Sequence, residues 1–305
     1  MAEFSAKDVA ELRKQTGCGM MDCKNALKDA NGDFEAAVKI LREKGMAATA
    51  KKADRIAAEG LVDIMTIGNT TAIVEVNSET DFVAKNAIFQ EFVKDILKSI
   101  IANKPADVDA LLASEFVLGG TVADALADKT YTIGEKLSIR RFAVVEGAVA
   151  TYIHGLGATG VIVSFDTDLA DKAEFVECAK NVALQTAAMP VQYLDKASVP
   201  ASVIEEEKAI LIAQMQQDPK MANKPTQVLE KIVEGKVGKF YENNCLMHQA
   251  YVKDDSMTVE KYVASVAKEL GGSIKVTGYV RYDKGEGLEK REENFADEIA
   301  KMVNG

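Results

Sequence analysis

The sequence contains an internal duplication in which two segments match, without a gap, at a constant separation of 87 residues, the distance from Asp81 to Asp168. The matched pairs are Glu59-Gly60 with Glu146-Gly147, Val62 with Val149, Gly68 with Gly155, Val74 with Val161, and Val76 with Val163. A fixed period carried through strand-like alternation indicates one supersecondary unit used twice. We therefore predict two related half-domains packed together in an α+β core.

The two copies differ in the loop that follows each predicted hairpin. The first loop reads Thr80-Asp81-Phe82-Val83-Ala84-Lys85, and the second reads Thr167-Asp168-Leu169-Ala170-Asp171-Lys172. A large aromatic ring is not needed for solubility in a loop, so Phe82 is the first functional candidate. The two aspartates could act as an acid-base pair, but Asp or Thr at a strand-to-helix turn commonly caps the following amides, and we favour the capping interpretation.

Composition restricts the classes of function. The chain has 305 residues, of which 48% are hydrophobic, and can form two to four domains with a large core. Its net charge of −10 argues against nucleic-acid binding, which needs a basic face. The N-terminus lacks an apolar signal region, and no stretch approaches the length of an apolar membrane span. We expect a cytoplasmic protein that binds neither nucleic acid nor membrane.

The sequence lacks the common signatures of catalysis and cofactor binding. It contains no P-loop, dinucleotide-binding glycine motif, zinc-protease helix motif or serine-hydrolase elbow. Its four cysteines and two histidines follow no metal-site spacing, so we expect reduced, structural thiols, with Cys23 as a buried apolar residue. We predict no catalytic residue, metal or cofactor, and no direct nucleotide binding.

Residues 5–49 are predicted to form three short helices. The first begins at Ser5, an N-cap with Asp8 three positions on, and ends at Gly17. The second covers about 20–30, and the third ends near Gly45, with 51–55 as a tether. Met20 and Met21 fit either the core or an adaptable contact surface, since thioether chains fill irregular gaps.

The remaining patterns alternate between strands and helices. We predict hairpins over 58–78 and 145–165, each followed by a helix, at 88–102 and 172–188. Residues 200–246 indicate a helical hairpin with its turn at 218–225, and Ile210, Ile212 and Met215 belong to the apolar stripe of its first arm. These stripes need a partner or a second copy of the chain. A strand is expected over 273–283 and a closing helix over 293–302. His154 lies in a glycine-rich turn, where it either contacts a partner or is a plain surface residue.

Several motifs occur in one order along nearly the whole chain: Thr16-Gly17-Cys18-Gly19-Met20-Met21-Asp22-Cys23-Lys24, Asn31-Gly32-Asp33, Lys51-Lys52-Ala53-Asp54-Arg55, Thr80-Asp81-Phe82-Val83-Ala84-Lys85-Asn86, Glu146-Gly147, His154-Gly155 and Gly285-Glu286-Gly287. In these motifs and their order the chain resembles the elongation factor Ts family (EF-Ts), the guanine-nucleotide exchange factors of elongation factor Tu (EF-Tu). The resemblance implies an exchange factor of translation elongation that is not an enzyme.

The resemblance also implies an architecture and a set of partner contacts. The domains would be a three-helix head like a ubiquitin-associated (UBA) domain over 1–55, a half-domain over 56–144, a second half-domain over 145–199 and 247–284, a helical-hairpin (coiled-coil) insertion over 200–246, and a C-terminal module over 285–305. Asp81 and Phe82 would intrude beside the magnesium and phosphate site of EF-Tu. Further EF-Tu contacts would be Met20, Met21, Lys24, Lys52, Ile133, Gly134 and His154.

Two other classes of function stay open at the level of sequence. One is a hydrolase or transferase that uses Asp81, Asp168 or Cys178. The other is a scaffold that forms a homo-oligomer through residues 200–246 and binds partners with its head.

Overall fold

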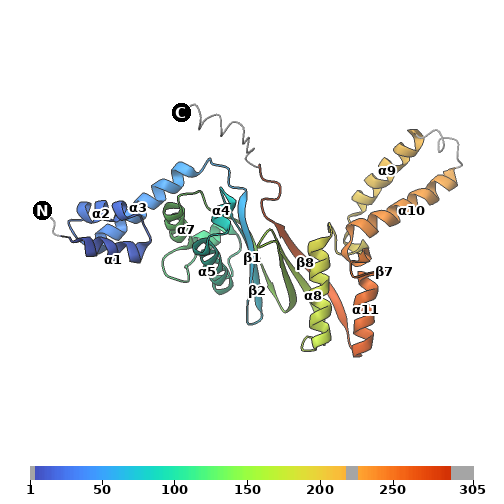
Figure 1. Cartoon of the computed structure of the whole chain (residues 1–305). Coiled ribbons are helices and arrows are strands. Elements are labelled where there is room, and N and C mark those ends of the chain that lie inside the picture. Colours follow the sequence, from blue (N-terminus) through green and yellow to red (C-terminus); the bar gives the residue numbers. More distant parts are fainter. Residues whose placement is uncertain (1–3, 218–225, 290–305) are drawn as a thin grey trace. The chain divides into compact units, whose positions relative to one another are not determined.

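The computed structural model describes residues 4–217 and 226–289 and shows a mixture of helices and small sheets (Figure 1). The predicted α+β class is therefore confirmed. The described residues form two compact units. Of the described residues, the first unit contains 4–144, 155–159 and 282–289, and the second contains 145–154, 160–217 and 226–281.

Three helices open the first unit: α1 (Ala6–Thr16), α2 (Met20–Asp29) and α3 (Phe34–Lys52). The predicted capping box is confirmed, because the Ser5 side chain accepts the Asp8 amide and the Asp8 carboxylate accepts the Ser5 amide. Leu12, Cys23 and Leu27 are fully buried between these helices, as the sequence predicts for Cys23.

The predicted end of the third helix near Gly45 is wrong, because α3 continues to Lys52. Gly45 lies against the backbone of Ala127 in α7 (Val122–Ile133). A glycine weakens an isolated helix, but here α3 is supported by α7, since a Cβ atom added at Gly45 would already lie at van der Waals distance, 3.4 Å, from the Ala127 carbonyl oxygen. The expected tether at 51–55 is thus partly helical.

The first copy of the duplicated unit is an antiparallel hairpin of β1 (Glu59–Ile67) and β2 (Thr70–Ser78), with Gly68 and Asn69 at its turn, as predicted. β3 (Ser138–Glu146) completes this sheet in the order β1-β2-β3. The short helix α4 (Asp81–Ala84) follows β2, and α5 (Ala87–Asn103) comes next, followed by α6 (Val108–Ala113). The core of this sheet and these helices includes Phe89, Phe92, Ile96 and Ile100 of α5.

The second unit has a similar order of elements. β4 (Ala148–His154) and β5 (Thr159–Thr167) form the hairpin, α8 (Ala173–Ala188) follows, and β8 (Ile274–Asp283) completes the sheet in the order β4-β5-β8. Between α8 and β8 the chain adds a group of other elements: η1 (Lys196–Ser198), α9 (Ala201–Gln217), α10 (Thr226–Asn244), η2 (Leu246–His248), β6 (Ala250–Tyr251), β7 (Asp254–Thr258) and α11 (Val259–Leu270).

Helices α9 and α10 pack on each other through Leu211, Met215, Val233 and Val237. The sequence prediction placed Ile210 and Ile212 on the apolar stripe of α9, but both are exposed because Leu211 between them is the buried residue. Neighbours in a helix do not share a face, so one buried position determines the phase. The predicted turn at 218–225 and closing helix at 293–302 lie outside the described residues.

Candidate functional site

Phe82 projects from α4 in the first unit, with 79% of its surface exposed. The next residue, Val83, is only 8% exposed and belongs to the core beneath. Adjacent side chains on a helical turn point in different directions, so one residue anchors the turn while the other faces solvent. The Nζ atom of Lys85 lies 5.9 Å from the centroid of the Phe82 ring.

A pair of carboxylates holds the residues that precede α4. Glu135 accepts the Thr80 amide at 2.9 Å and the Thr80 hydroxyl at 2.7 Å. In return, Glu79 accepts the Lys136 amide at 2.6 Å. These reciprocal, charge-assisted bonds bring the end of α7, with Ile133 and Gly134, beside the base of α4.

The prediction that Asp or Thr caps the following amides is wrong for the first copy, whereas in the second copy Thr167, and not Asp168, accepts such an amide. Asp81 lies inside α4 and accepts the Lys85 Nζ at 2.6 Å, and this hydrogen bond lowers the pKa of Asp81. The Thr80 hydroxyl is engaged by Glu135 and caps nothing. In the second copy Asp168 accepts the Ser273 amide at 2.8 Å, and only the Thr167 hydroxyl accepts a nearby amide, that of Leu169.

The candidate residues of the helical head differ in their surroundings. Met20 and Met21 are exposed by 45% and 62%, and Lys24 is also exposed, so all three are accessible on the start of α2. Lys52 instead donates from Nζ to the Thr130 carbonyl of α7 at 3.2 Å, and burial lowers its pKa. Lys52 therefore has a contact inside the first unit.

The other three candidates lie at element ends. Ile133 ends α7 half-buried against the core, and Gly134 follows it as a left-handed C-cap with φ of 87°. His154 ends β4 in the second unit, where it is exposed and its ring stacks on Tyr152 with centroids 6.3 Å apart.

Sequence reasoning missed Glu79 and Glu135, although both support α4. No local pattern distinguishes them from other surface glutamates, since each acts on a residue more than fifty positions away in the chain. It also missed Leu156, which is 91% exposed at the β4–β5 turn.

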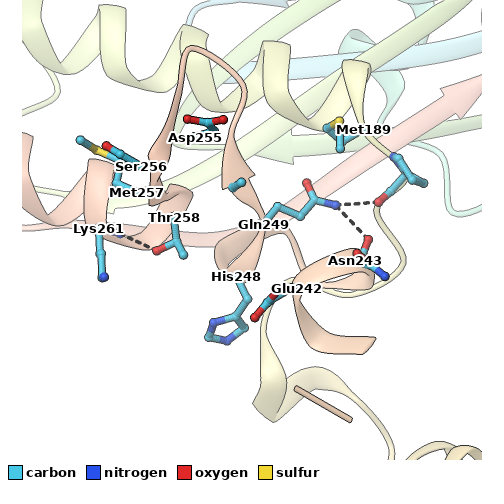
Figure 2. Close-up of a pocket in the computed structure, with 12 residues that line it drawn as sticks. Met189, Glu242, Asn243, His248, Gln249, Asp255, Ser256, Met257, Thr258 and Lys261 are labelled. Atoms are coloured by element: carbon cyan, nitrogen blue, oxygen red, sulfur yellow. Dashed lines mark hydrogen bonds between the residues drawn. The ribbon is translucent and has the colours of Figure 1, made fainter. Parts of the chain in front are cut away.

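A pocket in the second unit is lined by polar residues that include Glu242, His248, Gln249, Asp255 and Lys261 (Figure 2). Its buried Gln249 donates to the carbonyls of Pro190 and Asn243, at 2.7 and 3.2 Å. Ser256 donates its hydroxyl to Asp254 at 2.6 Å, and the Thr258 hydroxyl accepts the Lys261 amide. The hydrogen bonds named here thus serve to hold the backbone of the second unit together.

The structure gives no support to Cys178 as a nucleophile. Its thiol is buried, and burial raises its pKa to about 11, so it stays protonated at neutral pH. Over residues 4–217 and 226–289 no group of three or more metal-binding side chains is found, and no helix is apolar and long enough to cross a membrane.

Comparison with known proteins gives consistent matches. The family model described as elongation factor TS matches residues 79–286. A protein named elongation factor Ts from Syntrophotalea carbinolica is 46% identical over 305 residues, covering 99% of both chains. The protein of the same name from Clostridioides difficile is 48% identical over 307 residues, covering 99% of this chain and all of its own, and the one from Clostridium kluyveri is 44% identical over 310 residues, covering 99% of each.

Proposed function

The chain belongs to the elongation factor Ts family of translation elongation factors, and from this premise we propose that it is the guanine-nucleotide exchange factor of EF-Tu. It binds EF-Tu carrying GDP in the cytoplasm, disturbs the magnesium and phosphate site, and promotes GDP release so that GTP can bind. It forms and breaks no covalent bond, and it needs no cofactor of its own.

Exchange of this kind is a matter of coupled binding. The factor must bind nucleotide-free EF-Tu more tightly than the nucleotide-bound form. By linkage, the nucleotide then lowers the affinity of EF-Tu for the factor by the same ratio. Each ~1.4 kcal/mol removed from the barrier to GDP release speeds release about tenfold. The factor therefore needs rigid groups that contact EF-Tu best when the nucleotide site is open.

The observation that carries the proposal is an aromatic ring that is exposed on a braced support. Phe82 is 79% exposed, while Val83 and the bonds from Glu135 to Thr80 fix the backbone on either side of it. Burial of a phenylalanine in a partner pocket contributes about 1.5–3 kcal/mol, which corresponds to about tenfold to hundredfold in rate. Mg²⁺ tolerates little distortion of its octahedral shell, so a side chain inserted beside it further weakens the binding of the nucleotide to EF-Tu.

Replacement of Phe82 tests this role. We expect Phe82→Ala to slow the release of fluorescent GDP from EF-Tu about tenfold or more, since the wedge is lost. The melting temperature should stay near that of the parent, because the ring is exposed. Leu118→Ala is the matched control, a second exposed apolar residue of the first unit, 74% exposed, and should exchange like the parent. Equal rates for Phe82→Ala and the parent would remove the wedge.

The other residues that we propose to contact EF-Tu lie near α4, at the end of β4 and in the helical head. Asp81, already ionised beside Lys85, accompanies Phe82 at the magnesium site. Ile133 and Gly134 are held beside α4 through Glu135, and His154 contributes from the end of β4. Met20, Met21, Lys24 and Lys52 are assigned to contacts of a UBA-like head with the GTPase domain. Among these, Lys52 also donates a hydrogen bond from its amine to the Thr130 carbonyl.

One observation favours a second candidate function, a dimerising scaffold. Ile210, Ile212 and Val228 of the α9–α10 pair are exposed by 45%, 43% and 42%, and such apolar residues can associate with a second copy as in a coiled coil. A chain that sediments as a dimer and leaves GDP release from EF-Tu unchanged would favour the scaffold over the exchange factor.

A further inference from the structure

Leu156 is a large apolar residue held in an unfavourable position at the tip of the β4–β5 turn. Its side chain is 91% exposed, and its backbone has φ of 54°, in the left-handed region. Residues with a Cβ atom are disfavoured there, and asparagine or glycine is the usual occupant. Neither burial of the side chain nor backbone preference explains a leucine at this position.

The turn around Leu156 is fixed by its neighbours in the first unit. The Gly157 carbonyl accepts the Val62 amide at 2.8 Å, and the Ala158 carbonyl accepts the Lys284 amide at 2.8 Å. Gly157 is also packed so closely on β1 that an added Cβ atom would lie 2.8 Å from Leu61. The two residues that follow Leu156 are therefore anchored in the first unit, while the leucine side chain itself stays exposed.

Leu156 also belongs to the same surface as the α4 segment. It lines one small pocket together with Asp81, Ala84 and Lys85. This pocket lies wholly within the first unit. Asp81, which lines it, is next to Phe82 in the proposed exchange site. Strained residues persist where the surrounding structure enforces them, and they are concentrated at functional sites.

We propose that Leu156 is a second apolar contact to the GTPase domain that Phe82 contacts, so that both exposed side chains engage one partner. This inference rests on the proposed function. The partner that contacts Leu156 is the same GTPase domain, because Leu156 and Asp81 line one pocket and so share one continuous surface.

Two substitutions separate a contact from a structural role. Leu156→Asn and Leu156→Gly both suit the left-handed backbone, so the melting temperature should equal or exceed that of the parent. Affinity for EF-Tu, measured by calorimetry on the full chain, should fall about tenfold or more, because a leucine that becomes buried in the complex is lost. Leu118→Asn, in another exposed turn of the first unit, is the control and should bind like the parent.

Measurement of GDP release from EF-Tu with Phe82→Ala, alongside the calorimetry, distinguishes failure of the Leu156 contact from failure of the proposed function. If the parent does not bind EF-Tu, or if Phe82→Ala exchanges like the parent, the proposed function fails. If the parent binds and Phe82→Ala is impaired while both Leu156 variants bind like the parent, only the Leu156 contact is overturned. A fall in the melting temperature of both Leu156 variants would also overturn it, since leucine would then be a structural requirement of the turn.

Discussion

Glu75 on β2 is a carboxylate with no exposed surface that is surrounded by hydrogen-bond donors of the first unit. The Arg141 Nε donates at 2.7 Å, the Gly285 amide at 2.8 Å, and Arg140 and Asn77 at 3.1 Å each. Burial acts to raise the pKa of Glu75, but these donors outweigh it, and the pKa is lowered. One residue thus links β2, β3 and the turn at Gly285.

We expect Glu75→Gln to lower the free energy of unfolding by about 3 kcal/mol at pH 7, because it leaves two guanidinium groups without their buried partner. Since the folded pKa lies below the usual 4.5, the stabilisation is complete above pH 4.5 and is lost as the pH falls through the folded value. Urea unfolding should therefore show a gap between parent and variant that is constant from neutral pH down to about 5 and narrows below 4.5.

The control for this substitution is Glu91→Gln, which removes an exposed glutamate of the same unit from a 3.8 Å pair with Lys94. Its effect on stability should be small at every pH. A gap for Glu75→Gln that stays constant down to pH 3 would contradict the assignment of the charged carboxylate as the source of stability.

At the scale of an element, α4 is a helix of four residues, which is too short to be stable by itself. Its position depends on Val83 beneath it and on Glu135, which binds the amide and the hydroxyl of Thr80. The direction in which Phe82 projects is therefore decided by a side chain at the other end of the first half-domain.

We expect Glu135→Ala to slow GDP release from EF-Tu by roughly tenfold through loss of this positioning, about 1–2 kcal/mol. Glu135→Gln should recover much of the rate, since its amide can still accept from the Thr80 backbone. Stopped-flow rates over a range of factor concentrations should show a lower maximal rate, whereas a purely structural effect would only reduce the folded fraction. Glu115→Ala, an exposed glutamate of the same unit, should behave like the parent. Equal maximal rates for Glu135→Ala and the parent would exclude a positioning role.

At the scale of the molecule, the helical head is joined to the rest of the first unit. Lys52 bonds the Thr130 carbonyl, Tyr131 packs against the head core, and Lys136 donates to the carbonyls of Ala53 and Arg55. Arg55 in turn pairs with Glu79, one of the two carboxylates that brace α4. Hydrogen bonds and an ion pair therefore connect the head to the segment that supports α4.

This arrangement determines how the head should be tested. A variant with Met20→Ser and Met21→Ser should keep the melting temperature of the parent, because both side chains are exposed, but should bind EF-Tu about tenfold more weakly. Met46→Ser removes another exposed methionine, on α3, and should change neither quantity. Unchanged affinity in the double variant, measured by calorimetry, would show that the start of α2 does not contact EF-Tu.

Much of this molecule follows from local patterns in the sequence. The capping box at Ser5 and Asp8, the turn at Gly68 and Asn69, and the repeated hairpin and helix depend on residues only a few positions apart. Helical and strand periodicity and backbone preference act over the same short range. The exposed Phe82 was found in the same way, since it differs from its counterpart Leu169 in an otherwise matching loop.

The sequence by itself determined the α+β class, the duplication and the aromatic residue of the candidate site. Only the tertiary structure decided that α3 continues past Gly45 along α7, that Leu211 sets the buried face of α9, and that Thr80 bonds Glu135 instead of capping α4. In each of these three cases the deciding partner comes from another element. Such contacts compete with local preference and replace it, because a buried or charge-assisted contact outweighs the small free-energy differences among local conformations.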